Sequence, residues 1–268
     1  MKYIKLIIEF DGANYQGWQT QRSGLTIQDC MSRTISGITG EAIKLTGASR
    51  TDAGVHALGQ IAVFKTDSRL PEDTLKRALN AKLPNDIRIL DAQELDYEFH
   101  PRYQAVKKSY FYLIEKTQKQ SVFSHRYTWR IPVSLDLCSM NKASELLQGE
   151  HDFSAFRGTG CGAKTTVRTI HSITLSRHDY IDFMTVRIEG DFIKIRIEAN
   201  AFLRHMVRNI VGTLAEVGKG RISPESLTDI LASCDRKMAG PTAPAKGLFL
   251  EKVFCPADMV GGDPYRYQ

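Results

Sequence analysis

The sequence predicts an α+β fold of two similar subdomains, with mostly antiparallel sheets, helices packed on one side and a groove between the subdomains. Apolar runs with strand alternation are mixed with segments of helical period in both halves of the chain. In the second half, several strand-like segments follow one another with no helix between them. That order favours antiparallel sheet over a βαβ winding. The expected subdomains are residues 1–105 and 106–268.

The first half reads as strand, helix, strand, helix, strand. Residues 3–10 alternate as a strand that ends at the turn pair Asp11-Gly12. Thr26 can cap a helix whose apolar residues recur at helical spacing, and Gly40 can end it. The other expected elements are a strand over 59–66, a helix from Pro71 to about Leu83 and a strand over 86–95.

The second half repeats this mixture. Two helices are expected over 201–217 and 223–233, and a third over 136–147 with Leu137, Met140, Leu146 and Leu147 facing inward. The expected strands are 109–115, 169–177, 180–188, 192–198 and 248–254. Glu189-Gly190-Asp191 is predicted to be the turn between two of these strands.

Composition excludes several classes of protein. The formal net charge of +6 permits a polyanionic partner but does not require one. Five cysteines without C-x-x-C spacing predict neither a disulfide framework nor a zinc site. The seven histidines have no metal-ligand spacing. No apolar run approaches the ~20 residues that cross a membrane. We therefore expect a cytoplasmic protein with no metal and no cofactor.

Residues 47–60 are the most informative stretch, because they lack helix or strand periodicity and hold Arg50, Asp52 and Gly54 close together. A glycine there lets backbone approach a ligand closely, beside a carboxylate and a guanidinium. For Asp-x-Gly taken alone, an Asx-type turn with a solvated arginine is the more common structure. The surrounding sequence is what favours a catalytic role for Asp52 over a simple turn.

This stretch resembles the signature of the tRNA pseudouridine synthase A family, in which the aspartate of an Arg-Thr-Asp-Ala-Gly core is the nucleophile. Further blocks resemble the family in the same order along the chain, at residues 10–19, 108–112, 151–157, 200–212 and 247–250. Two departures are Phe10, where tyrosine is usual, and Ser49, where glycine is common. The resemblance spans nearly the whole chain.

The resemblance implies a role for each of six residues. Asp52 is the essential carboxylate, and Arg50 fills the gap left by a flipped base and grips phosphate. Tyr110 lies against the flipped base, with its hydroxyl near the proton that leaves C5. Arg208 is favoured as the partner of Asp52, with Arg204 either a second partner or an RNA contact. Leu248 packs under the base.

The residue types suit the chemistry. Pseudouridine formation breaks the N1–C1′ bond of uridine, turns the uracil over and rejoins it through C5. A carboxylate can attack carbon or remove a ribose proton and later reverse that step. Because the target base lies in a stem, it must be flipped out. An arginine near the carboxylate keeps it ionised. Arg204 and Arg208, four apart on the expected helix, share a face.

The expected partner is tRNA, bound at its anticodon stem-loop. The resemblance implies isomerisation of uridines at tRNA positions 38 to 40 by a homodimer. Each further basic residue taken alone is more often a solvated charge, but as a set interleaved with aromatic residues they suit phosphate contacts with a folded RNA. The basic residues are Arg22, Lys107, Lys108, Arg126, Arg130, Arg157, Lys164 and Arg168, and the aromatic ones are Tyr103, Phe123, Tyr127 and Trp129.

Two other functions remain open from the sequence. One is an RNA-binding or RNA-folding protein without catalysis, which would not need Asp52, Tyr110 or the helix arginines. The other is a carboxylate-based hydrolase of nucleosides or sugars, but such enzymes usually place two carboxylates at one bond. The motif here offers only Asp52.

Overall fold

A computed structural model describes residues 1–183 and 185–256 of the chain. The chain forms two compact units, which we describe separately. Unit 1 comprises Met1–Lys108 together with the chain from Leu250, and unit 2 comprises Ser109–Phe249. The C-terminal strand thus belongs mainly to the unit that also contains the N-terminus.

Unit 1 is built on a sheet with mostly antiparallel pairing. Its strands are β1 (Lys2–Phe10), β2 (Thr46–Gly47), β3 (His56–Thr66), β4 (Ile87–Leu95) and β10 (Leu248–Phe254). They are ordered β4-β1-β3-β10, and β2 pairs with β3. β1 runs antiparallel to both β3 and β4. Ile4, Leu6 and Ile8 of β1 are fully buried, so the expected strand at residues 3–10 is confirmed at the centre of this sheet.

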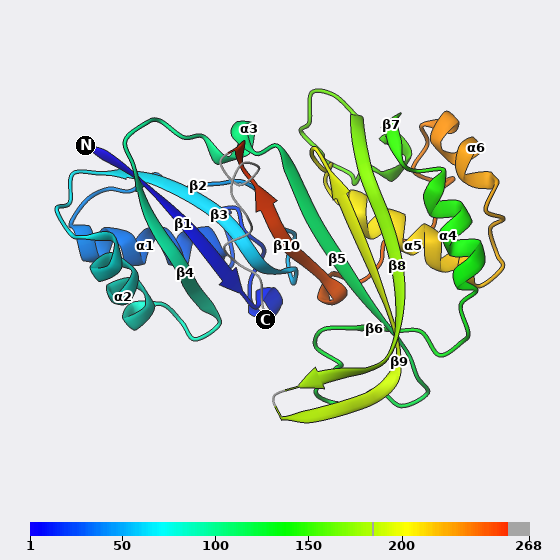
Figure 1. Cartoon of the computed structure of the whole chain (residues 1–268). Coiled ribbons are helices and arrows are strands. Elements are labelled where there is room, and N and C mark those ends of the chain that lie inside the picture. The colour runs from blue at the N-terminus through cyan, green and yellow to red at the C-terminus, as the bar shows by residue number, and fades with distance from the viewer. Residues whose placement is uncertain (184, 257–268) are drawn as a thin grey trace. The chain divides into compact units, whose positions relative to one another are not determined.

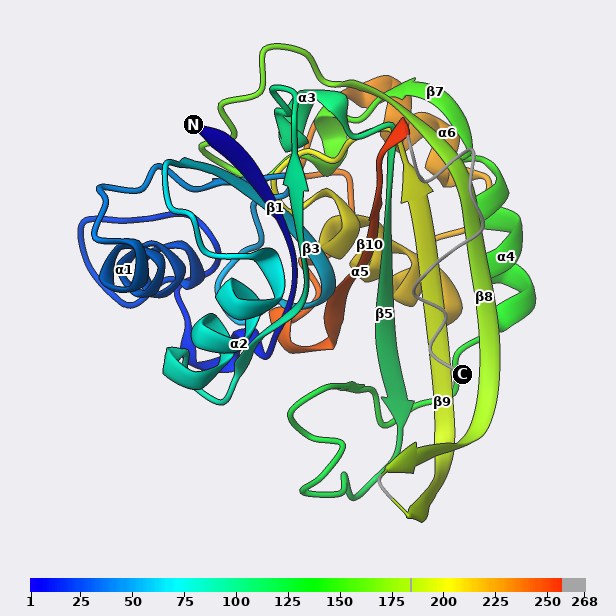
Figure 2. The same cartoon turned by 60° about the vertical axis from the view of Figure 1, so that its left-hand side comes forward.

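Two helices, α1 (Ile27–Thr39) and α2 (Glu72–Lys82), lie on the same face of this sheet (Figures 1 and 2). The Thr26 hydroxyl accepts a hydrogen bond from Asp29 N, and Gly40 ends α1 with φ +75°. These caps were expected from the sequence and are confirmed. The buried face of α1 consists of Ile27, Met31 and Ile35.

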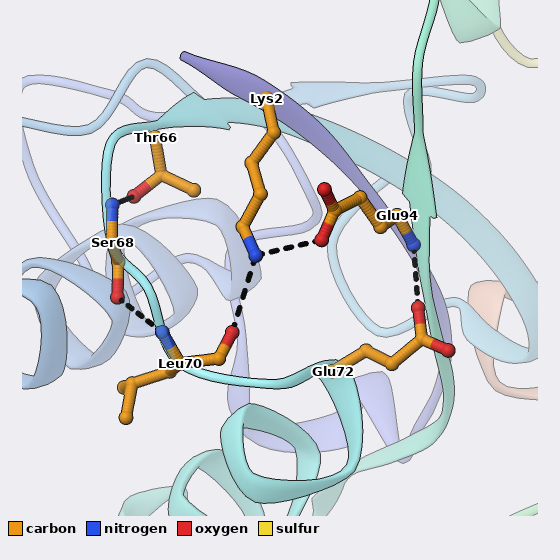
Figure 3. Close-up of polar contacts among 6 residues, drawn as sticks. All are labelled: Lys2, Thr66, Ser68, Leu70, Glu72 and Glu94. Carbon is orange, nitrogen blue, oxygen red and sulfur yellow. Dashed lines mark hydrogen bonds and ion pairs between the residues drawn. The ribbon is translucent and has the colours of Figure 1, made fainter.

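The link between β3 and α2 is tied to the sheet by polar contacts (Figure 3). Lys2 Nζ donates to the carbonyl oxygen of Leu70 at 3.3 Å and to Glu94 Oε2 at 2.7 Å. The Glu94 N–H in turn donates to Glu72 Oε2 at 2.8 Å. Residues of β1 and β4 therefore fix the position at which α2 begins.

Unit 2 also combines a sheet with helices. Its strands are β5 (Lys107–Lys116), β6 (Trp129–Arg130), β7 (Gly149–Asp152), β8 (Val167–Phe183) and β9 (Val186–Ala199). They are ordered β5-β9-β8-β7, with β6 parallel to β5. The helices are α4 (Leu137–Glu145), α5 (Met206–Gly218) and α6 (Ser226–Ser233), and α4 packs on α5. A short helix, α3 (Pro101–Gln104), precedes β5 in the chain.

The hairpin of β8 and β9 corrects the expected three strands. The segments 169–177 and 180–188 do not form two separate strands, because β8 runs to Phe183 and β9 starts at Val186. Glu189-Gly190-Asp191 lies inside β9 and is not a turn. A register shift between His178 and Tyr180 absorbs the irregularity. Residue 184, part of one expected strand, lies outside the described residues.

The α+β class is confirmed, since the β1–β3, β1–β4, β7–β8 and β8–β9 pairs are antiparallel and helices cover the sheet of unit 1 on one face. The prediction that Leu146 faces inward is wrong. α4 ends at Glu145, so Leu146 lies at the helix end and is 38% exposed. Met140 and Leu147 are fully buried, as expected.

Candidate active site

The loop between β2 and β3 carries Arg50 and Asp52 in unit 1, and backbone hydrogen bonds hold it on both sides. Ala48 N donates to Ile61 O at 2.8 Å, and Trp18 N donates to Thr51 O at 3.1 Å. Within the loop, Val55 N donates to Asp52 O at 3.2 Å and closes a turn. The Asp52 side chain is half-buried and that of Arg50 is exposed. The loop therefore presents both groups from a fixed backbone.

The Asp-Gly block near residue 11 packs directly against this loop. A Cβ on Gly12 would overlap the carbonyl of Val55, and a Cβ on Gly17 would overlap that of Thr51. Gly17 also has φ +88°, a left-handed conformation that favours glycine. Two blocks that lie about 40 residues apart in the sequence are therefore one structural unit.

Buried polar side chains complete the support of the loop. The fully buried amide of Gln60 accepts from Ser49 N at 3.2 Å and donates to Ser49 O at 2.7 Å. Lys108 is 8% exposed, and its Nζ donates to Ala48 O at 2.6 Å. Lys108 was expected to contact phosphate. Its ammonium is instead part of the support of the Asp52 loop.

His56 adds a further polar contact to this region. Its side chain is 2% exposed, and Nδ1 lies 3.1 Å from Gly12 N and 3.0 Å from Asp11 Oδ1. His56 therefore joins the start of β3 to the Asp-Gly turn. Trp18 also packs on this region, since its indole ring occupies the space where a Cβ on Gly47 would lie.

In unit 2, Tyr110 and Tyr112 lie on β5 and have different environments. Tyr110 is 6% exposed and meets the Phe202 ring edge-on, at 5.0 Å between centroids. Tyr112 is fully buried, and its hydroxyl donates to Pro244 O at 2.7 Å. Burial raises the pKa of Tyr112 well above its usual value, and the charge of Arg208 opposes this effect only in part. Tyr112 therefore remains a neutral structural donor.

Arg204 and Arg208 do not share a helix. α5 begins at Met206, because His205 adopts a left-handed conformation with φ +61°. An α-helix cannot pass through such a residue. The expected helix start at Ala201 is therefore wrong, and so is the common helical face of the two arginines. His205 lies over Gly158, where a Cβ would be 2.6 Å from its Nδ1.

The two guanidinium groups have different partners. Arg204 is exposed, and its Nη1 donates to Thr159 O at 3.1 Å. Arg208 is half-buried, and its Nε donates to Ala243 O at 2.7 Å. Ala243 N donates back to Arg208 O at 3.1 Å. The loop that follows α6 therefore sets the orientation of Arg208.

That loop is attached to α5 by Asn209, a residue outside the site predicted from the sequence. Asn209 is fully buried, and its Oδ1 accepts from Thr242 Oγ1 at 2.6 Å and from Arg236 Nη2 at 3.1 Å. Its Nδ2 donates to Phe156 O at 2.8 Å. A polar side chain on the apolar face of the helix was the signal that could have identified it.

Leu248 follows this loop and is 5% exposed at the start of β10. The preceding Gly247 lies against the Tyr112 ring, where a Cβ would be 2.7 Å away. Unit 2 thus connects Arg208, Tyr112 and Leu248 through residues 243–248. Arg50 and Asp52 belong to unit 1.

No group of three or more His, Cys, Asp or Glu side chains placed to hold a metal ion occurs in residues 1–183 and 185–256. Within the same residues, none of the helices is long and apolar enough to span a membrane.

A family model and individual related proteins both match this chain, and they carry the same family description. A family model described as tRNA pseudouridine synthase matches residues 6–104 and 143–256. The chain is 48% identical to the tRNA pseudouridine synthase A of Acetivibrio thermocellus over 254 residues, which cover 95% of this chain and all of that protein. It is 45% identical to the tRNA pseudouridine synthase A of Thermodesulfovibrio yellowstonii, over 94% of this chain and 99% of that protein.

Proposed function

The chain belongs to the tRNA pseudouridine synthase family and is an isomerase of uridine in tRNA, and on this premise we propose that Asp52 is its essential carboxylate. The observation that carries the proposal is the construction of the 47–56 loop. Buried side chains and the glycines of the 11–19 segment hold its backbone, so the Asp52 side chain extends from a fixed backbone, which favours a positioned catalytic group.

The reaction leaves the atoms of uridine unchanged in number. The N1–C1′ bond breaks, the C5–C1′ bond forms, C5 loses a proton and N1 gains one. Asp52 acts either by attacking carbon or by removing a ribose proton, and in both cases the carboxylate is regenerated. A primary isotope effect from deuterium on the ribose carbon next to C1′ would favour proton removal.

The remaining roles are proposed from the same family pattern. Arg50, exposed beside Asp52, occupies the space left by the flipped base and contacts phosphate. Tyr110 contacts the base with its hydroxyl near C5, and Leu248 packs beneath it. Arg208 is the partner of the Asp52 carboxylate. Arg204, which is exposed and lies outside α5, contacts RNA.

We further propose that the substrate region is the anticodon stem-loop, at tRNA positions 38 to 40, and that a cytoplasmic homodimer acts on it. Pseudouridine mapping of tRNA from cells that lack the protein tests the positions. Loss of pseudouridine elsewhere in tRNA, with positions 38 to 40 unchanged, would contradict the proposal.

The decisive experiment compares wild-type protein with Asp52→Asn, which keeps the size of the side chain but removes the anion. Tritium release from C5-labelled uridine in tRNA is expected for wild type and absent for Asp52→Asn. Circular dichroism and tRNA binding on the same preparation show whether the variant is folded. Asp96→Asn, an exposed substitution in the same unit, is the matched control.

Each alternative function has its own outcome in this experiment. A non-catalytic RNA-binding protein would release no tritium even as wild type. A nucleoside hydrolase would release free uracil, which chromatography detects. A folded Asp52→Asn protein that makes pseudouridine at near wild-type rate would overturn the role of Asp52.

A further inference from the structure

The loop of residues 117–128, which joins β5 to β6 in unit 2, exposes two adjacent apolar side chains. Val122 is 80% exposed and Phe123 is 57% exposed. Ser124 and Thr128 in the same loop are buried. Both views place the loop at the end of unit 2 where the β8–β9 hairpin turns (Figures 1 and 2). Binding residues are often carried on loops that a rigid scaffold positions, so the exposed Phe123 ring is a candidate contact for a partner.

A buried carboxylate fixes the shape of this loop. Glu115 is 3% exposed, and its Oε2 accepts hydrogen bonds from three side chains of the loop. The donors are Ser124 Oγ at 2.7 Å, Thr128 Oγ1 at 2.8 Å and Gln120 Nε2 at 3.1 Å. A charged acceptor makes these bonds stronger than neutral ones. Glu115 therefore holds the middle and the C-terminal end of the loop in one conformation.

Further bonds close the loop at its base. Arg130 donates from Nε to Thr117 O at 3.1 Å and from Nη2 to Gln118 O at 2.7 Å. Lys246 Nζ donates to His125 O at 2.8 Å. The conformation that exposes Phe123 is thus formed before any partner binds, which reduces the ordering cost of binding.

The charge of the segment indicates what kind of partner fits. Residues 116–135 include Lys116, Lys119, Arg126 and Arg130 and contain no aspartate or glutamate. Lys116 Nζ lies 3.5 Å from Asp191 Oδ2, so its charge is partly offset. An aromatic ring among cations, with no acidic residue in the segment, fits an anion that also offers flat apolar faces. Single-stranded RNA has this chemistry.

We propose that residues 117–128 form a preformed RNA-contact arm, on which Phe123 stacks against an unpaired base of the tRNA substrate. Lys119 and Arg126 contact the phosphates beside that base, and Glu115 is the positioning residue of the arm. This inference rests on the proposed function for the identity of the RNA. It adds a contact outside the residues assigned to the isomerisation itself.

The first test measures tRNA binding by the full-length protein as a function of salt. Stacking of one base corresponds to roughly tenfold in affinity or more, so we expect Phe123→Ala to weaken binding by about that factor with an unchanged salt slope. Tyr97→Ala, an aromatic residue of 51% exposure in unit 1, is the matched control and should bind as wild type.

The cations should behave differently from Phe123. Each phosphate contact contributes about 0.7 to 0.9 to the slope of log affinity against log salt. Combined Lys119→Ala and Arg126→Ala substitutions should therefore reduce the slope by about 1.5. Lys142→Ala with Lys237→Ala, two exposed lysines of unit 2 outside the arm, removes the same charge and should leave the slope nearly unchanged.

The positioning role of Glu115 is tested by a double-mutant cycle. Glu115→Ala should weaken binding about as much as Phe123→Ala, and the double variant should be no worse than either single variant. Glu115→Gln, which keeps an acceptor oxygen, should restore most of the binding. Additive losses would assign Glu115 to general stability. Circular dichroism verifies the fold, and the Phe123 test does not depend on Glu115.

Two results would overturn the proposal. One is unchanged tRNA affinity of Phe123→Ala over the whole salt range. The other is a change of oligomeric state of Phe123→Ala in sedimentation, which would assign the loop to protein contact. Wild-type tritium release is measured in parallel. If wild type binds tRNA through residues 117–128 but releases no tritium, the proposed isomerase function is contradicted and the RNA-contact role of these residues is supported.

Discussion

The Nζ of Lys108 lies 2.6 Å from the carbonyl oxygen of Ala48, and this buried contact links the start of β5 to the loop that carries Asp52. The sequence favoured a contact between this lysine, which immediately precedes Ser109 and Tyr110, and RNA phosphate. Its position instead indicates that the Asp52 loop depends on a donor about 60 residues further along the chain.

Lys108→Met should lower both stability and turnover. It removes the donor to Ala48 O and leaves a buried carbonyl unsatisfied, which costs about 1–3 kcal/mol. Urea unfolding measures the loss of stability, and tritium release from labelled tRNA measures turnover. The control is Lys65→Met, since Lys65 is exposed in the same unit and lies over the Tyr3 ring. Equal losses in both variants would contradict a specific role for Lys108.

Gly17→Ala should destabilise unit 1 by roughly 2–5 kcal/mol, because left-handed backbone costs ~1–2 kcal/mol outside glycine and overpacking adds ~1–3. Gly40→Ala is the matched control, with φ +75° and open space around the position. Gly40→Ala should lose only the stability that corresponds to the cost of left-handed backbone. Denaturant titration of both proteins separates the two contributions, and equal losses would mean that the contact with Thr51 contributes nothing.

Arg50→Ala should reduce kcat more than tRNA affinity. The side chain is exposed beside Asp52, and we propose that it acts after docking, when the flipped base needs its place filled. Single-turnover kinetics and equilibrium binding on one preparation give both quantities. Affinity lost in proportion to activity would reassign Arg50 to phosphate anchoring alone.

Arg208→Lys should reduce turnover about 100-fold, because a misplacement near the reacting groups has an effect of that order. Lysine cannot donate to Ala243 O and also present a guanidinium face. Arg204→Ala should instead raise KM and lower the salt slope of binding, with kcat nearly unchanged. The reverse pattern would exchange the roles of the two arginines.

Activity should survive an excess of chelator when monovalent salt keeps the tRNA folded. No step assigned to Asp52, Tyr110 or Arg208 needs a metal ion. Tritium release with and without chelator provides the measurement, and strict loss of activity that zinc restores would contradict the prediction.

Local sequence signals determined most of the elements. Thr26 and Gly40 set the ends of α1 because capping groups act within one turn of the residues they satisfy. The alternation in β1 and the bounds of β10 likewise follow from nearby side chains. The Arg-Thr-Asp-Ala-Gly stretch identified the family because its residue types and order are rare in combination.

Other features depended on contacts between distant residues. Glu189-Gly190-Asp191 has turn chemistry, but pairing with β8 holds it in β9. The helical pattern from Ala201 is interrupted by His205, which adopts φ +61° and lies over Gly158. No local signal shows that Lys108 meets Ala48 or that Asn209 holds the loop of Arg208. The element types and the candidate carboxylate could be predicted from local sequence. Which polar groups are buried together depends on the folded chain, because a buried donor must find its acceptor wherever the fold places one.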